Sequence, residues 1–339
     1  MPFTILRMLI SVSLFIVWPF IEAVERPVVG VFTRINEKGE HYIAASYIKW
    51  LESAGVRAIS IHSDDTRGED LKKIFGQING VLFPGGAGRT GLQVARNLWE
   101  MANELNEQGG HFPIWGTCLG FEIMIELASS RGPSSLQRDF HANDVSLLLE
   151  FTKYGIENSS MFADKDIREI TSEQEVAYNH HQMGIEPEYF MADEGIRDLF
   201  EVTSISHDLN GRPFVSSMEA RDTTMYPYYA VQWHPEKNNF EFGTFPGTDV
   251  HYAKGICHSA DAIRVSQALA NFFSEEVRKN DHRYLDVERF PLVWNYELKQ
   301  GVEFEQYFVI PRSFNNIYLQ DYEKNGEIAT NYLRSRVTE

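Results

Sequence analysis

The stretch Gly116-Thr117-Cys118-Leu119-Gly120 decides the fold of this chain. It follows an apolar run at residues 112–115 and precedes residues 121–127, whose apolar side chains have helical spacing. A strand, G-x-C-x-G and a helix form the thiol version of the nucleophile elbow, a turn so tight that a Cβ on either side of the cysteine would clash. The pattern predicts a sulfur displayed over a helix N-terminus, which favours the thiolate. The alternative is a buried structural cysteine between two incidental glycines.

Strands and helices alternate on both sides of this turn. The apolar patterns predict strands at 28–31, 56–61, 81–83 and 112–115, and helices at 43–54, 69–78 and 92–107. Such alternation is typical of an α/β, doubly wound fold with a mostly parallel sheet and helices on both faces. Ligands of these folds bind at the carboxyl ends of the strands, where Gly85-Gly86 and Cys118 both fall.

The second half of the chain changes character. Short β-rich pieces at 145–151, 212–219 and 228–233 predict an antiparallel section that completes the same core, and helix returns at 260–277. We therefore expect one domain over residues 24–280. Residues 281–339 show weak periodicity and are expected to form a partly peripheral C-terminal extension.

The first 23 residues have the pattern of a secretory signal peptide. Arg7 precedes an apolar stretch at 8–20, and Ile21-Glu22-Ala23 is a plausible cleavage site. The stretch is too short to span a bilayer. It predicts entry into the secretory pathway, with the lysosome, a vacuole or the extracellular space as the destination. Asn158-Ser159-Ser160 is then a candidate glycosylation site.

The net charge of the chain limits the kinds of molecule that it is expected to bind. The 339 residues contain 48 acidic and 31 basic side chains, a formal net charge of −17, and no basic cluster. This balance argues against nucleic acid and against anionic membrane surfaces as partners.

The chain has two cysteines, Cys118 and Cys257. A disulfide is the usual expectation for an even count in a secreted protein. A chain of this length builds a sufficient core without one, so we expect both thiols to remain unbridged.

A nucleophilic cysteine needs a base and a group that orients the base. His234-Pro235-Glu236 follows a strand-like run at 228–233 and offers both, because Glu236 can accept a hydrogen bond from the imidazole and fix its tautomer. The alternative is an ordinary surface tripeptide.

Acyl transfer also needs hydrogen-bond donors for the developing oxyanion. Gly85 and Gly86 follow the strand at 81–83, and their backbone N–H groups, with that of Leu119, form a plausible oxyanion hole. An ordinary Pro-Gly turn is the alternative.

Taken together, these motifs resemble the class I glutamine amidotransferase-like superfamily, and within it the γ-glutamyl hydrolases (folylpoly-γ-glutamate hydrolases, peptidase family C26). The resemblance extends over about residues 26–280. The matching stretches are Tyr42-Ile43-Ala44-Ala45-Ser46-Tyr47, Leu51-Glu52-Ser53-Ala54-Gly55, residues 78–86, residues 113–122 and residues 231–237.

The resemblance implies roles for particular residues. Cys118 is implied as nucleophile, His234 as base and Glu236 as its orienting group. A cleft histidine is implied in the segment 178–184, at His181 rather than His180, although adjacent polar histidines are more often loop residues. Glu122 is implied as a cleft residue that meets a substrate ammonium group; the alternative is an acid that only complements the helix dipole.

The resemblance also implies an activity. Glutamine and a γ-glutamyl peptide both carry the scissile carbonyl on the glutamate side chain, so a thiolate forms the same γ-glutamyl thioester from either. This chain has no room for a synthetase domain that would accept ammonia, so water is the expected acceptor. The implied enzyme is a homodimeric cysteine hydrolase that needs no cofactor or metal and cleaves folyl or antifolyl poly-γ-glutamates. A catalytically silent binding protein and a γ-glutamyl peptidase for non-folate conjugates are the alternatives.

Overall fold

The computed structural model describes residues 24–64, 68–87 and 91–312. The predicted signal peptide at residues 1–23 and the end of the predicted C-terminal extension lie outside these ranges. Within them, no helix is long and apolar enough to cross a membrane.

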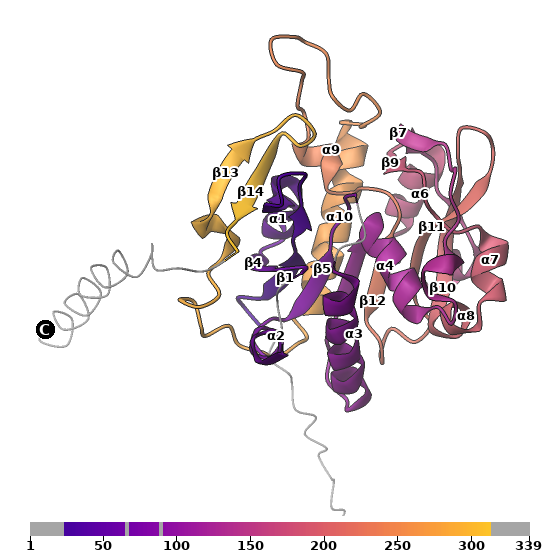
Figure 1. Ribbon diagram of the computed structural model, residues 1–339. Coiled ribbons are helices and arrows are strands. Elements are labelled where there is room, and N and C mark those ends of the chain that lie inside the picture. Colours follow the sequence, from indigo (N-terminus) through magenta and orange to yellow (C-terminus); the bar gives the residue numbers. More distant parts are fainter. Residues whose placement is uncertain (1–23, 65–67, 88–90, 313–339) are drawn as a thin grey trace, which may run out of the picture.

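An eight-stranded sheet forms the centre of the molecule (Figure 1), with the strand order β4-β1-β5-β6-β12-β11-β10-β8. Its first five strands are parallel, and β11, β10 and β8 continue it in antiparallel pairs. The strands are β1 (Val28–Phe32), β4 (Arg57–Ile61), β5 (Gly80–Phe83), β6 (Ile114–Thr117), β8 (Glu150–Phe151), β10 (Phe200–His207), β11 (Pro213–Ala220) and β12 (Tyr228–Val231). This sheet confirms the predicted α/β class and its antiparallel section.

Both faces of the sheet are covered, because successive strand residues point to opposite sides. Val28 packs into one apolar cluster with α2 (Gly68–Phe75), α3 (Leu92–Glu107) and α4 (Leu119–Ala128). Val29 packs into a second cluster with α1 (Ala45–Ser53) and α10 (Ala260–Val277). The predicted helices on two faces are therefore confirmed.

A second sheet joins the two ends of the described chain. Its order is β13-β14-β3-β2, with β2 (Arg34–Ile35), β3 (His41–Ala44), β13 (Glu297–Gln300) and β14 (Gln306–Ile310). Figure 1 shows the yellow strands β13 and β14 beside α1. The prediction of helix from residue 43 was wrong at its start, because residues 41–44 pair with β14 before the helix begins.

The segment after residue 280 contributes to this structure. Phe290, Val293 and Ile310 are buried in the two clusters of the core. How the chain divides into domains stays a prediction.

The remaining described elements belong to neither of these two sheets. They are η1 (Gly132–Ser135), β7 (Ala142–Leu147), α5 (Lys153–Glu157), α6 (Lys165–Glu173), β9 (Ala177–His181), α7 (Pro187–Ala192), α8 (Glu194–Leu199), α9 (Lys237–Phe240) and η2 (Val293–Asn295). Strand β9 pairs with β7 in a two-stranded sheet. The thiols of Cys118 and Cys257 are both free, which confirms the prediction that they are unbridged.

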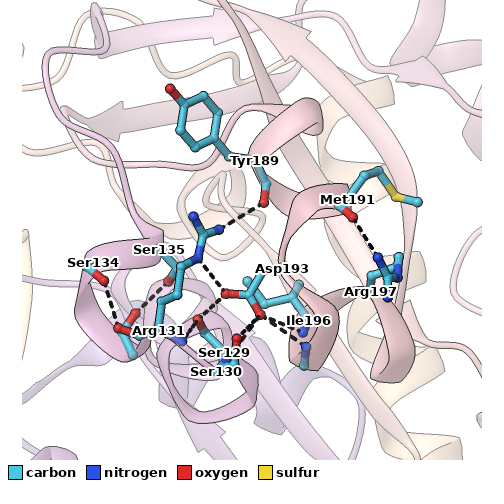
Figure 2. Close-up of polar contacts among 12 residues, drawn as sticks. Ser129, Ser130, Arg131, Ser134, Ser135, Tyr189, Met191, Asp193, Ile196 and Arg197 are labelled. Atoms are coloured by element: carbon cyan, nitrogen blue, oxygen red, sulfur yellow. Dashed lines mark hydrogen bonds and ion pairs between the residues drawn. The ribbon is translucent and has the colours of Figure 1, made fainter.

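A buried aspartate ties the end of α4 to the start of α8 (Figure 2). Asp193 accepts hydrogen bonds from Ser129 Oγ at 2.5 Å and from the Gly195 N–H at 3.1 Å, and it pairs with Arg131 Nε at 2.9 Å. Burial alone would raise the pKa of Asp193, but the hydrogen bonds from Ser129 and Arg131 outweigh it and hold this pKa below its ordinary value. Asp193 thus fixes the far end of the helix that begins at Cys118.

Replacing Asp193 with alanine is expected to lower the free energy of unfolding by roughly 3 kcal/mol at neutral pH, because it removes a buried carboxylate from its ion pair with Arg131 and leaves the hydrogen-bond donors around it unsatisfied. The native state binds this proton more weakly than the unfolded state, so the contribution is complete above the ordinary pKa of 3.8 and is lost as the pH falls below it. Urea unfolding at several pH values checks this. Asp198→Ala, on the same helix with its side chain 73% exposed, is the control. A stability difference that does not shrink in acid would contradict the account.

Candidate active site

Cys118 sits at the junction of β6 and α4, as the elbow pattern predicts. Its φ of 52° and ψ of −107° are far from the values that a non-glycine residue prefers. Its N–H donates to the carbonyl of Val231 in β12 at 2.8 Å, and its carbonyl accepts from the Glu122 N–H at 3.0 Å. Strained backbone of this kind is tolerated where the surrounding structure holds it, and it is often found at active sites.

The two glycines of the elbow have no room for a side chain. A Cβ on Gly120 would lie 1.9 Å from the carbonyl oxygen of Phe83 in β5, and one on Gly116 would lie 2.7 Å from Met124 Sδ. Helix α4 therefore approaches the sheet backbone as closely as glycine permits. This contact sets where the helix begins, and with it the position of the sulfur.

His234 and Glu236 form a buried pair directly after β12. The Nδ1 atom of His234 lies 2.8 Å from Glu236 Oε1, and both side chains are almost fully buried. A carboxylate at Nδ1 assigns the proton to that nitrogen and leaves Nε2 as the proton acceptor. The pair has the geometry of a base with its orienting group.

Gly85 is the point where these groups meet. A Cβ placed there would lie 2.7 Å from His234 Cε1 and 3.2 Å from Cys118 Cβ. The structure thus brings together Gly85, Cys118 and His234, which lie on three different connections of the sheet. Parallel strands bring this about because their carboxyl ends share one edge.

The Cys118 thiol is in a less polar setting than the elbow pattern suggests. Burial raises its pKa above the ordinary value, and the carboxylates of Glu122 and Glu236 raise it further. The Leu119 N–H and the Lys237 ammonium act in the opposite direction. Burial and the two carboxylates therefore oppose the thiolate that the helix N-terminus is expected to favour.

The three backbone N–H groups predicted to bind the oxyanion have different surroundings in the structure. The Gly85 N–H donates to the hydroxyl of Tyr47 at 2.7 Å, so another group already uses it. Gly86 has a φ of 142° and lies against the side chain of Arg34. The Leu119 N–H is directed at the Cys118 sulfur. The N–H groups of Gly85 and Leu119 therefore both have partners in this structure, and the role of the three residues as oxyanion donors stays a prediction.

Tyr47 is a component of the site that the motifs do not single out. It is buried on α1, and its hydroxyl lies 3.4 Å from His234 Nδ1 as well as accepting from Gly85. Burial and the neighbouring Glu236 carboxylate raise its pKa well above the ordinary value, so the phenol stays neutral. In a sequence, an inward-facing aromatic residue on a helix has the pattern of a core residue, so the motifs predict no role for Tyr47 in the site.

Glu122 is buried in the first turn of α4, and its role as a cleft residue stays a prediction. Its buried side chain accepts a hydrogen bond from Gln232 Nε2 at 3.4 Å, and its charge acts on both Cys118 and Arg34. Its charge therefore acts on the nucleophile position, and its place in the first turn of α4 also suits the helix dipole.

His181 is buried at the end of β9. Its Nδ1 lies 2.7 Å from the Met183 carbonyl oxygen and its Nε2 lies 3.2 Å from Asn179 Oδ1. Both oxygens are acceptors, so a neutral ring donates to only one of them. Burial lowers its pKa to about 3, which keeps it neutral. His180, by contrast, keeps part of its surface exposed, and its pKa is also lowered, by partial burial and by the nearby charges of His234 and Lys237. The role of His181 in binding stays a prediction.

Among the described residues, no group of three or more His, Cys, Asp or Glu side chains is arranged to hold a metal ion.

Comparisons with known proteins identify the family of this chain. The Peptidase C26 family model matches residues 27–236. The chain is 34% identical over 309 residues to "Gamma-glutamyl hydrolase B" of Dictyostelium discoideum, covering 86% of this chain and 84% of that protein. It is 35% identical over 280 residues to "Gamma-glutamyl hydrolase" of Mus musculus, covering 79% and 83%. A solved glutaminase domain of Trypanosoma brucei CTPS with bound acivicin is 14% identical, with a TM-score of 0.49 and coverage of 75% and 95%. The family match covers more than half of the chain, and this chain belongs to the Peptidase C26 family.

Proposed function

We propose that this chain hydrolyses γ-glutamyl bonds of folyl and antifolyl poly-γ-glutamates through a γ-glutamyl thioester on Cys118. The observation that carries the proposal is the convergence of Cys118 and the His234–Glu236 pair on Gly85. Membership of a peptidase family and similarity to γ-glutamyl hydrolases over most of the chain support hydrolysis of this bond type.

The first half of the reaction forms the thioester. Nε2 of His234 takes the proton of the Cys118 thiol, and the sulfur attacks the γ-carbonyl carbon. The Gly86 and Leu119 N–H groups stabilise the oxyanion. The C–N bond then breaks, and the imidazolium gives its proton to the leaving amine. Glu236 stabilises the imidazolium between these two transfers.

The second half releases the product. Water enters where the amine left, His234 takes one of its protons, and the oxygen attacks the thioester carbon. The C–S bond breaks and the sulfur recovers a proton from His234. The product is the shortened substrate with a free γ-carboxylate, and the thiol is regenerated.

Glu122 and His181 are proposed to contribute to substrate binding. A buried carboxylate in the first turn of α4 suits an ammonium or an amide N–H of the substrate. The phenol of Tyr47, which spans the Gly85 N–H and His234, is proposed to keep the turn at 84–86 in register with the imidazole.

Several expectations about the cellular form belong to the same proposal. The signal pattern at residues 1–23 supports passage through the secretory pathway, to a lysosome, a vacuole or the extracellular space. Asn158 ends α5 with an exposed side chain, which suits glycosylation. The homodimer is implied by resemblance alone, and sedimentation of the purified protein tests it.

Mass spectrometry of the products from a folyl pentaglutamate tests the function. We expect shortened folyl glutamates and released glutamate or glutamate oligomers, all with intact α-carboxylates. The pattern of lengths also reports whether cleavage is internal or terminal. Turnover of γ-glutamyl conjugates without a pterin, with none of the folyl substrate, would favour the non-folate peptidase. No turnover of either, with the protein folded, would favour a binding protein.

A further inference from the structure

Lys237 is a nearly buried cation near the His234–Glu236 pair that the mechanism above does not use. It follows Glu236 directly and begins α9, and only 8% of its surface is exposed. Its backbone N–H donates to the carbonyl of His234 at 3.4 Å, so the lysine and the base share one turn.

Two aromatic rings from distant parts of the chain flank the ammonium group. Lys237 Nζ lies 4.8 Å from the centre of the Phe304 ring, which precedes β14, and 6.0 Å from that of Tyr178 in β9. Tyr178 is itself fixed, because its hydroxyl donates to Asp144 Oδ1 at 3.1 Å. The ring of Tyr178 lies 6.1 Å from that of His234. The ammonium is therefore held on the His234 side of the cleft.

The charge of Lys237 is not balanced by a contact carboxylate. Within the described ranges, no Asp or Glu oxygen lies within 4 Å of its nitrogen. Its charge instead acts at longer range, on Cys118 and on Glu241. A buried cation is costly without an anion beside it, and aromatic rings offset only part of that cost. The arrangement suits an anion that arrives with the substrate.

The position of the leaving group relative to His234 indicates which substrate anion lies near Lys237. His234 must protonate the leaving nitrogen, so the leaving residue lies on the His234 side of the scissile carbonyl. In a poly-γ-glutamate that residue is a glutamate, whose α-carboxylate is attached to the carbon next to the leaving nitrogen. On the proposed function, this carboxylate is the substrate anion nearest to Lys237.

We propose that Lys237 binds the α-carboxylate of the leaving glutamate and so selects glutamate as the leaving residue. The contact is made to substrate and persists in the transition state, and it is lost with the departing product. It makes Lys237 a specificity-determining residue, separate from the bond-breaking groups.

Two substrates that differ only in this carboxylate test the inference. They are 4-aminobenzoyl-γ-glutamyl-glutamate and 4-aminobenzoyl-γ-glutamyl-4-aminobutyrate. We expect the wild type to prefer the glutamate substrate by about 30-fold in kcat/KM, the effect of one charge-assisted hydrogen bond. Lys237→Met should lose about 30-fold on the glutamate substrate and less than about twofold on the other. Lys237→Arg should recover part of the preference, because it keeps the charge.

Matched controls separate the possible outcomes. Lys49→Met removes another partly buried lysine, one that donates to Gln306 Oε1, and should leave the preference unchanged. Equal losses on both substrates in Lys237→Met would overturn the inference, because they would mean that the lysine only supports His234. A wild type without preference would overturn it even if the variant does not fold. A wild type that cleaves neither substrate would count against the proposed function itself.

Discussion

Replacing Cys118 with alanine is expected to lower kcat/KM on a γ-glutamyl substrate by about 10⁴-fold or more, because no other nucleophile is positioned at the elbow. The fold should survive, since alanine fits wherever the cysteine does and the thiol makes few stabilising contacts. Turnover of a folyl polyglutamate, measured beside the urea unfolding curve of the same preparation, checks both statements.

Glycine at the same position gives an internal control. Cys118→Gly should be equally inactive but more stable than Cys118→Ala by about 1 kcal/mol, because glycine relieves the strained backbone. Activity that persists at more than a few per cent in either variant would exclude Cys118 as the nucleophile. An alanine variant more stable than the glycine variant would contradict the strain.

The second large effect is expected at Gly120. A methyl group there would lie 1.9 Å from the Phe83 carbonyl oxygen, so Gly120→Ala must push α4 away from β5. We expect the free energy of unfolding to fall by roughly 3 kcal/mol, as for severe overpacking. We also expect kcat to fall by about 100-fold or more in the folded fraction, because the sulfur moves with the helix. Urea unfolding and active-site titration of the folded protein check the two parts.

Gly76→Ala is the matched control for this substitution. A Cβ on Gly76 would lie 3.6 Å from the Lys72 carbonyl oxygen, an ordinary van der Waals distance, so the variant should keep both stability and activity. If Gly120→Ala behaves like Gly76→Ala, the close approach of α4 to the sheet does not set the position of the nucleophile.

Much of this architecture could be predicted because it depends on short-range patterns. The helix at 92–107 agrees with α3, and the carboxyl-end rule brings the elbow to the same edge as the glycine turn. Strands β3 and β14 could not be predicted in the same way. They form because residues 41–44 and 306–310 meet across the fold, and neither segment has a strong pattern of its own.

The candidate site also contains residues that the sequence predicts and residues that it does not. Short motifs with recognisable chemistry contain Cys118, His234 and Glu236. Tyr47 and Lys237 are not singled out in this way, because an inward tyrosine and a lysine after a loop are ordinary in sequence, and only their neighbours give them a role. The pKa of the Cys118 thiol could not be predicted from the sequence either. The helix N-terminus at Cys118 suggested a thiolate, whereas burial beside Glu122 and Glu236 raises the pKa of the thiol.

Trapping of the covalent intermediate tests whether Cys118 carries the γ-glutamyl group. The enzyme would be mixed with a folyl polyglutamate, quenched in acid within a single turnover, digested, and analysed by mass spectrometry. We expect a folyl-γ-glutamyl group joined as a thioester to the peptide that contains Cys118, sensitive to hydroxylamine and absent from Cys118→Ala. Full substrate turnover with no acyl group on that peptide, or retained turnover in Cys118→Ala, would contradict this role of Cys118.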